Sequence, residues 1–263
     1  MGKNRINTEM GEKMGKGFDW NKVSHSLRSA IISTTGKILH LYFSGGDKSL
    51  ENTAKGYIKK TQTQINIDNA SKEAIQKFIT GGKGIIISNH QSGNFSDYLP
   101  LFSIFGDKVL KNGPCYTGIY NFNMNKREFP EYTFRPATMR TIQDGKDIIN
   151  YIDNDTKYLK NTGGFLFELP SGAETSEEAE FQGIFRRIIT KSDEKLPILV
   201  NKISYKEPMG YKDVLLSLLG KKKPIVTIKT KLELVKDWKD ISGKAMSGKE
   251  MRERYNNLFK QSH

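Results

Sequence analysis

Short runs of hydrophobic residues alternate along this chain with longer segments in which hydrophobic positions recur every three or four residues. The clearest runs cover residues 84–87, 165–167 and 196–200. Continuous apolar runs are typical of strands buried on both faces of a parallel sheet, and the amphipathic segments between them are typical of helices that cover such a sheet. The pattern therefore predicts a single α/β domain with a central, mostly parallel sheet flanked by helices.

Further elements follow from the same pattern. Residues 214–220 precede three lysines and allow two interpretations, a core helix or a membrane-dipping loop, of which we favour the helix. No element is assigned to residues 230–247. Helices are predicted over residues 50–60, 69–79, 98–105, 138–158 and 248–259, and strands over 64–68, within 109–120 and over 225–229.

The chain divides into three parts. Residues 1–17 are polar and rich in glycine and lysine, which predicts a flexible tail, and residues 18–46 are predicted to form an amphipathic helical region. Residues 47–263 hold the α/β domain. The apolar face of the helical region has two interpretations: packing on the sheet, which we slightly favour, and an interfacial membrane anchor with Phe18 and Trp20 at the headgroup level.

The composition narrows the choice of partners. In 263 residues, 42 lysines and arginines outnumber 29 acidic residues, which gives a formal net charge of +13. Such a charge suits nucleic acid or an anionic membrane surface. No nucleic-acid-binding motif accompanies it, so we favour the membrane surface or a phosphate-bearing substrate over nucleic acid. No run approaches the ~20 apolar residues that a membrane span needs, and we expect a cytoplasmic protein.

The candidate chemistry lies directly after the apolar run at 84–87. The sequence S-N-H occupies 88–90, and in open α/β sheets ligands bind at the carboxyl ends of the strands. The carboxylate of Asp97 suits an imidazole base at His90, and we favour this role over that of a hydrogen-bonded loop residue. The single cysteine, Cys115, lacks a base nearby and has no companion ligands, so we expect a filler role and no metal site.

The stretch S-N-H-Q-S at 88–92, followed by D-Y-L-P-L at 97–101, resembles the first motif of the lysophosphatidic acid acyltransferase superfamily, the glycerolipid acyltransferases, whose signature is N-H-x4-D. His90 corresponds to the motif histidine. Phe95 stands where the motif has its aspartate, so we assign that aspartate to Asp97 through a two-residue insertion. The G-N-F that ends at Phe95 is also similar to the G-N-W of the lipid A acyltransferases, whose motif is H-x4-E.

Two stretches resemble the second and fourth motifs of the family. Y-T-F-R at 132–135 is similar to the end of the second motif, in which an apolar-rich strand precedes an arginine that contacts the acceptor phosphate. The resemblance implies this role for Arg135, whose guanidinium is able to grip phosphate through two donors; an ordinary surface arginine is the alternative. K-L-P-I-L-V at 195–200 resembles the fourth motif, a strand that lines the acyl pocket.

The third motif of the family, F-P-E-G-T-R, is similar to L-P-S-G-A-E at 169–174, although positions 171 and 174 differ from it. F-Q-G-I-F-R at 181–186 then resembles the helix start that follows this motif. Glu168, just before the motif, either replaces its lost acid or serves as a structural ion-pair partner, which we favour. The resemblance implies substrate binding by Pro170, Ser171, Gly172 and Arg186.

The resemblance implies an enzyme, an acyltransferase similar to the 1-acylglycerol-3-phosphate O-acyltransferases of phospholipid biosynthesis. It would move a fatty acyl group from acyl-CoA or acyl-carrier-protein to a hydroxyl of a lipid acceptor such as a lysophospholipid, without a cofactor. His90 would be the general base, Asp97 would orient it, and backbone amides at 171–173 would stabilise the oxyanion. The alternative is a non-catalytic lipid- or membrane-binding protein of the same fold. In both cases we expect peripheral association with the membrane.

Overall fold

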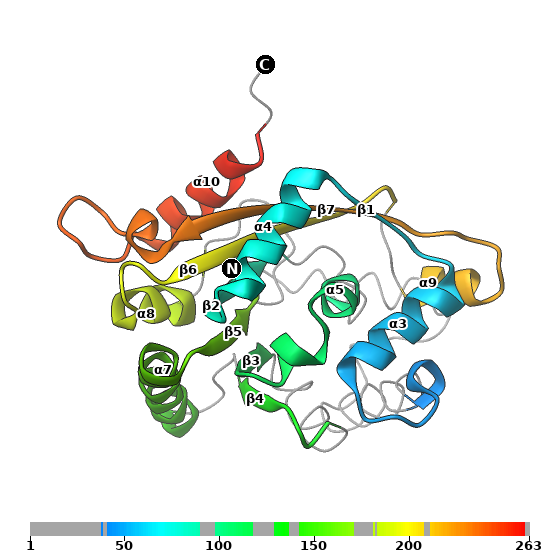
Figure 1. The fold of residues 1–263 in the computed structure, drawn as a ribbon, viewed down its shortest axis with the longest axis horizontal. Helices are drawn as coiled ribbons and strands as arrows, with labels where there is room; N and C mark the ends of the chain where they lie inside the picture. Colours follow the sequence, from blue (N-terminus) through cyan, green and yellow to red (C-terminus); the bar gives the residue numbers. More distant parts are fainter. Residues whose placement is uncertain are drawn as a thin grey trace, which may run out of the picture.

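The protein forms one seven-stranded sheet that is covered by helices on both faces (Figure 1). This arrangement confirms the prediction of a single-sheet α/β fold. The computed structural model describes residues 38, 41–89, 98–117, 129–136, 142–170, 181, 183–207 and 211–260. The predicted tail at 1–17 and most of the predicted helical region at 18–46 therefore lie outside the described residues.

The sheet has the strand order β1-β7-β6-β2-β5-β3-β4. All neighbouring strands pair in parallel except β6 and β7, which are antiparallel from Pro197 opposite Leu234 to Tyr205 opposite Val226. β1 and β7 consequently run against the other strands of the sheet, which is mostly parallel, as predicted. The strands are β1 Gln64–Ile67, β2 Lys83–Ser88, β3 Pro114–Thr117, β4 Thr133–Pro136, β5 Gly164–Glu168, β6 Pro197–Tyr205 and β7 Ile225–Leu234.

Alternate residues of β2 belong to two separate hydrophobic cores, one on each face of the sheet. Ile86 packs in the core beneath one set of helices, and Ile85 and Ile87 pack in the core beneath the other set. This explains why the run at 84–87 is apolar at every position. The first set is α3 Leu50–Thr61, α4 Asn69–Thr80, α5 Leu99–Leu110 and α9 Tyr211–Leu218; the second is α7 Ile142–Thr162, α8 Gly183–Lys191, the 3-10 helix η3 Val235–Trp238 and α10 Gly248–Leu258.

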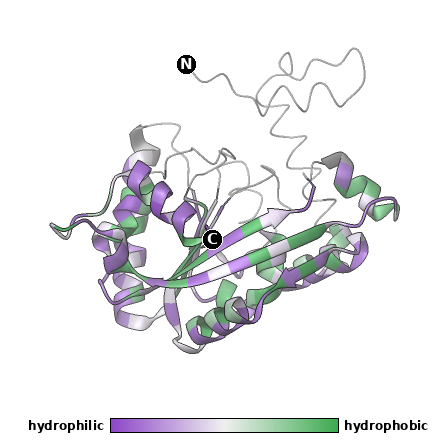
Figure 2. Ribbon diagram, turned by 90° about the horizontal axis from the view of Figure 1, so that it is seen from above, coloured by the Kyte–Doolittle hydropathy of each residue, from purple (hydrophilic) through white to green (hydrophobic). Residues whose placement is uncertain are grey.

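Local sequence signals account for the helix boundaries. Ser49 caps α3 by accepting a hydrogen bond from the amide of Asn52 at 3.0 Å, and Asp68 caps α4 by accepting from the amide of Ser71 at 2.7 Å. Hydrophobic and hydrophilic residues alternate along the helices (Figure 2), as expected of helices that lay one face on a sheet. The predicted helices at 50–60 and 69–79 are confirmed almost to the residue.

One segment of the fold, residues 230–247, was not predicted. The segment without an assignment contains the end of β7 and the helix η3, whose Trp238 is completely buried in the second core. The helix predicted within residues 214–220 is confirmed for residues 214–218, which belong to α9, and its Val214 is buried in the first core. Within the described part of the chain, no helix is long and apolar enough to cross a membrane.

Candidate active site at the carboxyl ends of β2 and β5

The fold has a topological switch point between two neighbouring strands. β2 and β5 are parallel partners, yet the helices that follow them lie on opposite faces of the sheet, α5 in the first core and α8 in the second. In open α/β sheets, ligands bind outside the carboxyl ends of the strands at such a switch point. Asn89 follows β2 at this point, and Glu168 ends β5. The S-N-H sequence at 88–90 and the L-P-S-G-A-E sequence at 169–174 therefore start from neighbouring strand ends.

The buried Asn89 side chain continues the pairing of β2 with β6 beyond the last backbone pair. Its Nδ2 donates to the carbonyl of Ile203 at 2.9 Å, and the amide of Ile203 donates to its Oδ1 at 2.7 Å. The hydroxyl of Tyr255 on α10 donates to the same Oδ1 at 3.2 Å. Asn89 thus holds the backbone directly before His90 to the centre of the sheet.

A second buried asparagine, Asn201 on β6, ties three strands together. Its Nδ2 donates to the carbonyl of Ile87 at 3.1 Å, and its Oδ1 accepts from the hydroxyl of Thr230 on β7 at 2.9 Å. Its backbone carbonyl accepts from Tyr255 at 2.6 Å. Sequence reasoning missed Asn201 and Tyr255. A polar residue directly after the apolar run at 196–200 was the only signal that pointed to one of them.

Glu168, the last residue of β5, has a buried carboxyl group. Its side chain is 1 % exposed, and among the described residues Oε2 has no hydrogen-bond partner and no cation forms an ion pair with the group. Burial raises the pKa of Glu168 from 4.5 to about 8. None of the described residues forms the predicted ion pair with Glu168, so this role stays a prediction, and desolvation is the cause of the raised pKa.

A row of side chains extends from Glu168 across the second face of the sheet. Cys115 pairs with Phe167, so the next residues, Tyr116 and Glu168, lie side by side on β3 and β5. Tyr116 in turn pairs with Arg135 on β4. The Tyr116 hydroxyl donates to Oδ2 of Asp155 at 2.9 Å. Burial, together with the negative charges of Asp155 and Glu168, raises the pKa of Tyr116 and keeps the phenol protonated.

Arg135 meets Asp155 through two parallel hydrogen bonds. Its Nε donates to Oδ2 at 3.1 Å and its Nη2 donates to Oδ1 at 3.0 Å, and the guanidinium lies 4.6 Å from the centre of the Tyr151 ring. Two of the donors proposed for a phosphate are thus bound to a carboxylate. The phosphate contact itself stays a prediction. The Arg135 side chain is partly exposed, at 27 %, and is held in an ion pair with the buried Asp155.

Of the six remaining predicted site residues, two lie within the described structure. Pro170 is buried two residues after Glu168, whereas Arg186 is exposed on α8 and donates from Nε to the carbonyl of Met246 at 3.0 Å. His90, Asp97, Ser171 and Gly172 lie outside the described residues. The structure therefore brings together the segments that lead to these four residues and does not test the residues themselves.

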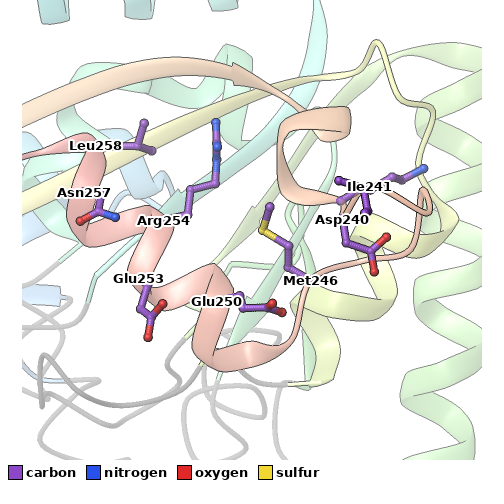
Figure 3. A pocket seen from close by; sticks show the side chains of 9 residues that line it. Asp240, Ile241, Met246, Glu250, Glu253, Arg254, Asn257 and Leu258 are labelled. Carbon is purple, nitrogen blue, oxygen red and sulfur yellow. The ribbon is translucent and has the colours of Figure 1, made fainter.

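Cys115 has the environment of a buried, unreactive thiol. Cys115 is buried, and burial raises the pKa of its thiol to about 12, which agrees with the predicted filler role. In the portion of the chain covered by the structure, no group of three or more His, Cys, Asp or Glu residues is placed to hold a metal ion. A hollow of about 610 Å³ lies between α10 and the loop after η3 (Figure 3), and its lining residues are all distant in sequence from the ends of β2 and β5.

Comparisons with known proteins add no family assignment: no protein-family model matches the chain, and no curated protein matches it.

Proposed function

We propose that the protein is an acyltransferase of the glycerolipid type. It transfers a fatty acyl group from the thioester of acyl-CoA or acyl-carrier-protein to a hydroxyl of a lipid acceptor such as a lysophospholipid. The observation that carries the proposal is the S-N-H sequence at the switch point of the sheet. β2 ends at Ser88, and the Asn89 side chain anchors the backbone immediately before His90 to Ile203.

In the proposed reaction, His90 is the general base. It accepts the proton of the acceptor hydroxyl as that oxygen attacks the thioester carbonyl, and it returns the proton to the departing sulfur when the carbon–sulfur bond breaks. Asp97 orients the imidazole, and backbone amides at Ser171 and Gly172 stabilise the oxyanion of the tetrahedral intermediate. Glu168 is protonated below about pH 8, so it offers the site a neutral hydrogen-bond donor.

The acceptor phosphate is assigned to Arg135, with Arg186 as a second contact. Support comes from the position of Arg135 on β4, which is parallel to β3 and so ends at the same edge of the sheet as β2 and β5. Asp155 fixes the plane of the Arg135 guanidinium through two hydrogen bonds. A guanidinium fixed in this way loses less side-chain entropy when it binds a phosphate.

Replacement of His90 tests the proposal. We expect His90→Ala to lower acyl transfer by about 10²–10⁴-fold, the usual contribution of a general base, while the protein keeps its unfolding transition. The measurement is thiol release from palmitoyl-CoA and from palmitoylated acyl-carrier-protein in the presence of lysophosphatidate. His40→Ala, a histidine outside the motif, is the matched control and should behave as the unchanged protein. Full transfer activity in His90→Ala would contradict the proposal.

The second candidate is a non-catalytic lipid-binding protein, favoured by the loss of the motif glutamate and arginine at positions 171 and 174. This candidate predicts binding of lysophospholipid by the unchanged protein without transfer from any thioester donor. The same assay decides between the two, because transfer that depends on His90 excludes a purely binding role.

A further inference from the structure

The helix between β6 and β7 carries a pair of exposed leucines. On α9, Val214 and Ser217 are buried against the first core, whereas Leu215 is 58 % exposed and Leu219, directly after the helix, is 69 % exposed. The amide of Leu219 donates to the carbonyl of Leu215 at 3.1 Å, so the helical turn continues between them. Residues four apart in a helix share one side, and the two leucines therefore form a single outward-facing apolar pair.

The turn that follows is rigid and basic. The amide of Lys221 donates to the carbonyl of Leu216 at 2.8 Å, and Lys222 forms ion pairs with Asp213 at 2.9 Å and Glu207 at 3.3 Å. Lys221 and Lys223 on either side are exposed. The structure thus holds two leucines and two lysines at one end of α9, and Lys222 ties this group to the rest of the protein.

α9 stands at the same edge of the sheet as the candidate active site. It follows the carboxyl end of β6, which is parallel to β2, and it packs beside α3 (Figure 1). The last turn of α3 contributes Lys59 and Lys60, both exposed. The apolar pair and the exposed Lys221 and Lys223 that follow it thus lie at the edge of the sheet where a lipid acceptor would reach the candidate site.

We propose that α9 docks the protein on an anionic lipid bilayer, with Leu215 and Leu219 inserted at the headgroup boundary and Lys221 and Lys223 on lipid phosphates. The partner is a bilayer because two leucines supply far less contact area than the roughly 800 Å² per partner of a stable protein interface. The net charge of +13 complements an anionic surface. The inference rests on the proposed function only in that a membrane-bound acceptor gives the docking a purpose.

Vesicle binding by the full-length protein tests the docking. We expect co-sedimentation with vesicles of phosphatidylcholine and phosphatidylglycerol, weaker binding to phosphatidylcholine alone, and a loss of about tenfold or more in affinity for the double variant Leu215→Ser/Leu219→Ser. The charge-reversed pair Lys221→Glu/Lys223→Glu should lose affinity for the anionic vesicles and should also lose the salt dependence of binding. Unchanged thermal unfolding of both variants confirms that the surface alone has been altered.

The chain offers a matched control in Ile241, which is fully exposed on the loop between η3 and α10. Ile241→Ser removes an exposed hydrophobic side chain elsewhere and should bind vesicles as the unchanged protein does. Equal binding by the leucine variant and the unchanged protein, or no binding of the unchanged protein to anionic vesicles, overturns the docking proposal.

The two proposals fail in different ways. If the unchanged protein binds anionic vesicles but transfers no acyl group from either thioester donor, docking stands and the acyltransferase proposal fails. If the leucine variant keeps transfer to a short-chain, water-soluble acceptor and binds vesicles normally, the docking proposal fails and the acyltransferase proposal stands.

Discussion

Replacement of Glu168 by glutamine should stabilise the protein, and the gain should grow as the pH rises from about 5 to about 8. Burial raises the pKa of this carboxyl from 4.5 to about 8 in the folded protein. A raised pKa means that the folded state prefers the protonated form. Below the unfolded pKa, the Glu168 carboxyl therefore does not reduce the free energy of unfolding. As the pH rises from the unfolded pKa through the folded pKa, the free energy of unfolding falls progressively. Glutamine stays neutral throughout and avoids this loss.

The expected gain follows from the size of the pKa shift. At about 1.4 kcal/mol for each pKa unit, Glu168→Gln should change the free energy of unfolding little near pH 4 and raise it by roughly 3–5 kcal/mol above pH 8. Urea unfolding across this range measures the difference. Glu250→Gln is the control, since hydrogen bonds from Ser247 lower the pKa of the exposed Glu250 and predict the opposite sign. A difference for Glu168→Gln that is independent of pH would contradict the prediction.

A stabilising substitution at a native glutamate also bears on function. A carboxyl group that is buried without a partner costs stability, and such groups are retained mostly at functional sites. If Glu168 donates a hydrogen bond in the reaction, Glu168→Leu, which has no donor, should lose acyl transfer, whereas Glu168→Gln keeps a neutral donor in its amide and should retain more of it. The thiol-release assay used for His90 measures both proteins side by side.

Local elements of this fold were predictable because their signals are local. The run at 84–87 predicted β2, and the spacing at 50–60 predicted α3, since each pattern depends on neighbours a few residues apart. The direction of β7 was not predictable, because a strand pattern does not encode which partner it takes. Trp238 was missed for a similar reason: its burial comes from the rings of Phe181 and Phe185, which lie more than 50 residues earlier.

The candidate site also combines features that have a local sequence signal with contacts that only the tertiary structure creates. The end of β2 predicted where the S-N-H sequence stands, but the hydrogen bonds of Asn89 join residues 114 positions apart in the chain. Asp155 was not selected, because an aspartate within a helical pattern is usually on the solvent side. Only the tertiary structure turns this aspartate toward Arg135 and Tyr116.

Asp155→Ala should lower the free energy of unfolding by about 2–4 kcal/mol. The Asp155 carboxylate is 8 % exposed and accepts hydrogen bonds from Arg135 and Tyr116. Alanine leaves both donors without this acceptor, and the buried phenol of Tyr116 has little access to water in its place. Urea unfolding at neutral pH measures the loss.

The same helix supplies a control that isolates burial as the cause. Asp153 binds Arg187 through two hydrogen bonds of 3.1 and 2.7 Å, but the two side chains are 39 % and 33 % exposed. Because water replaces the lost partner at such a site, Asp153→Ala should cost less than about 1 kcal/mol. Similar losses for the two alanine variants would show that the row from Glu168 to Arg135 is more hydrated than its burial indicates. A larger loss of unfolding free energy for Asp155→Ala would show that the cost comes from leaving the donors of Arg135 and Tyr116 without an acceptor. If Asp155→Asn recovers part of the lost stability, that part comes from hydrogen bonding and not from the charge of Asp155.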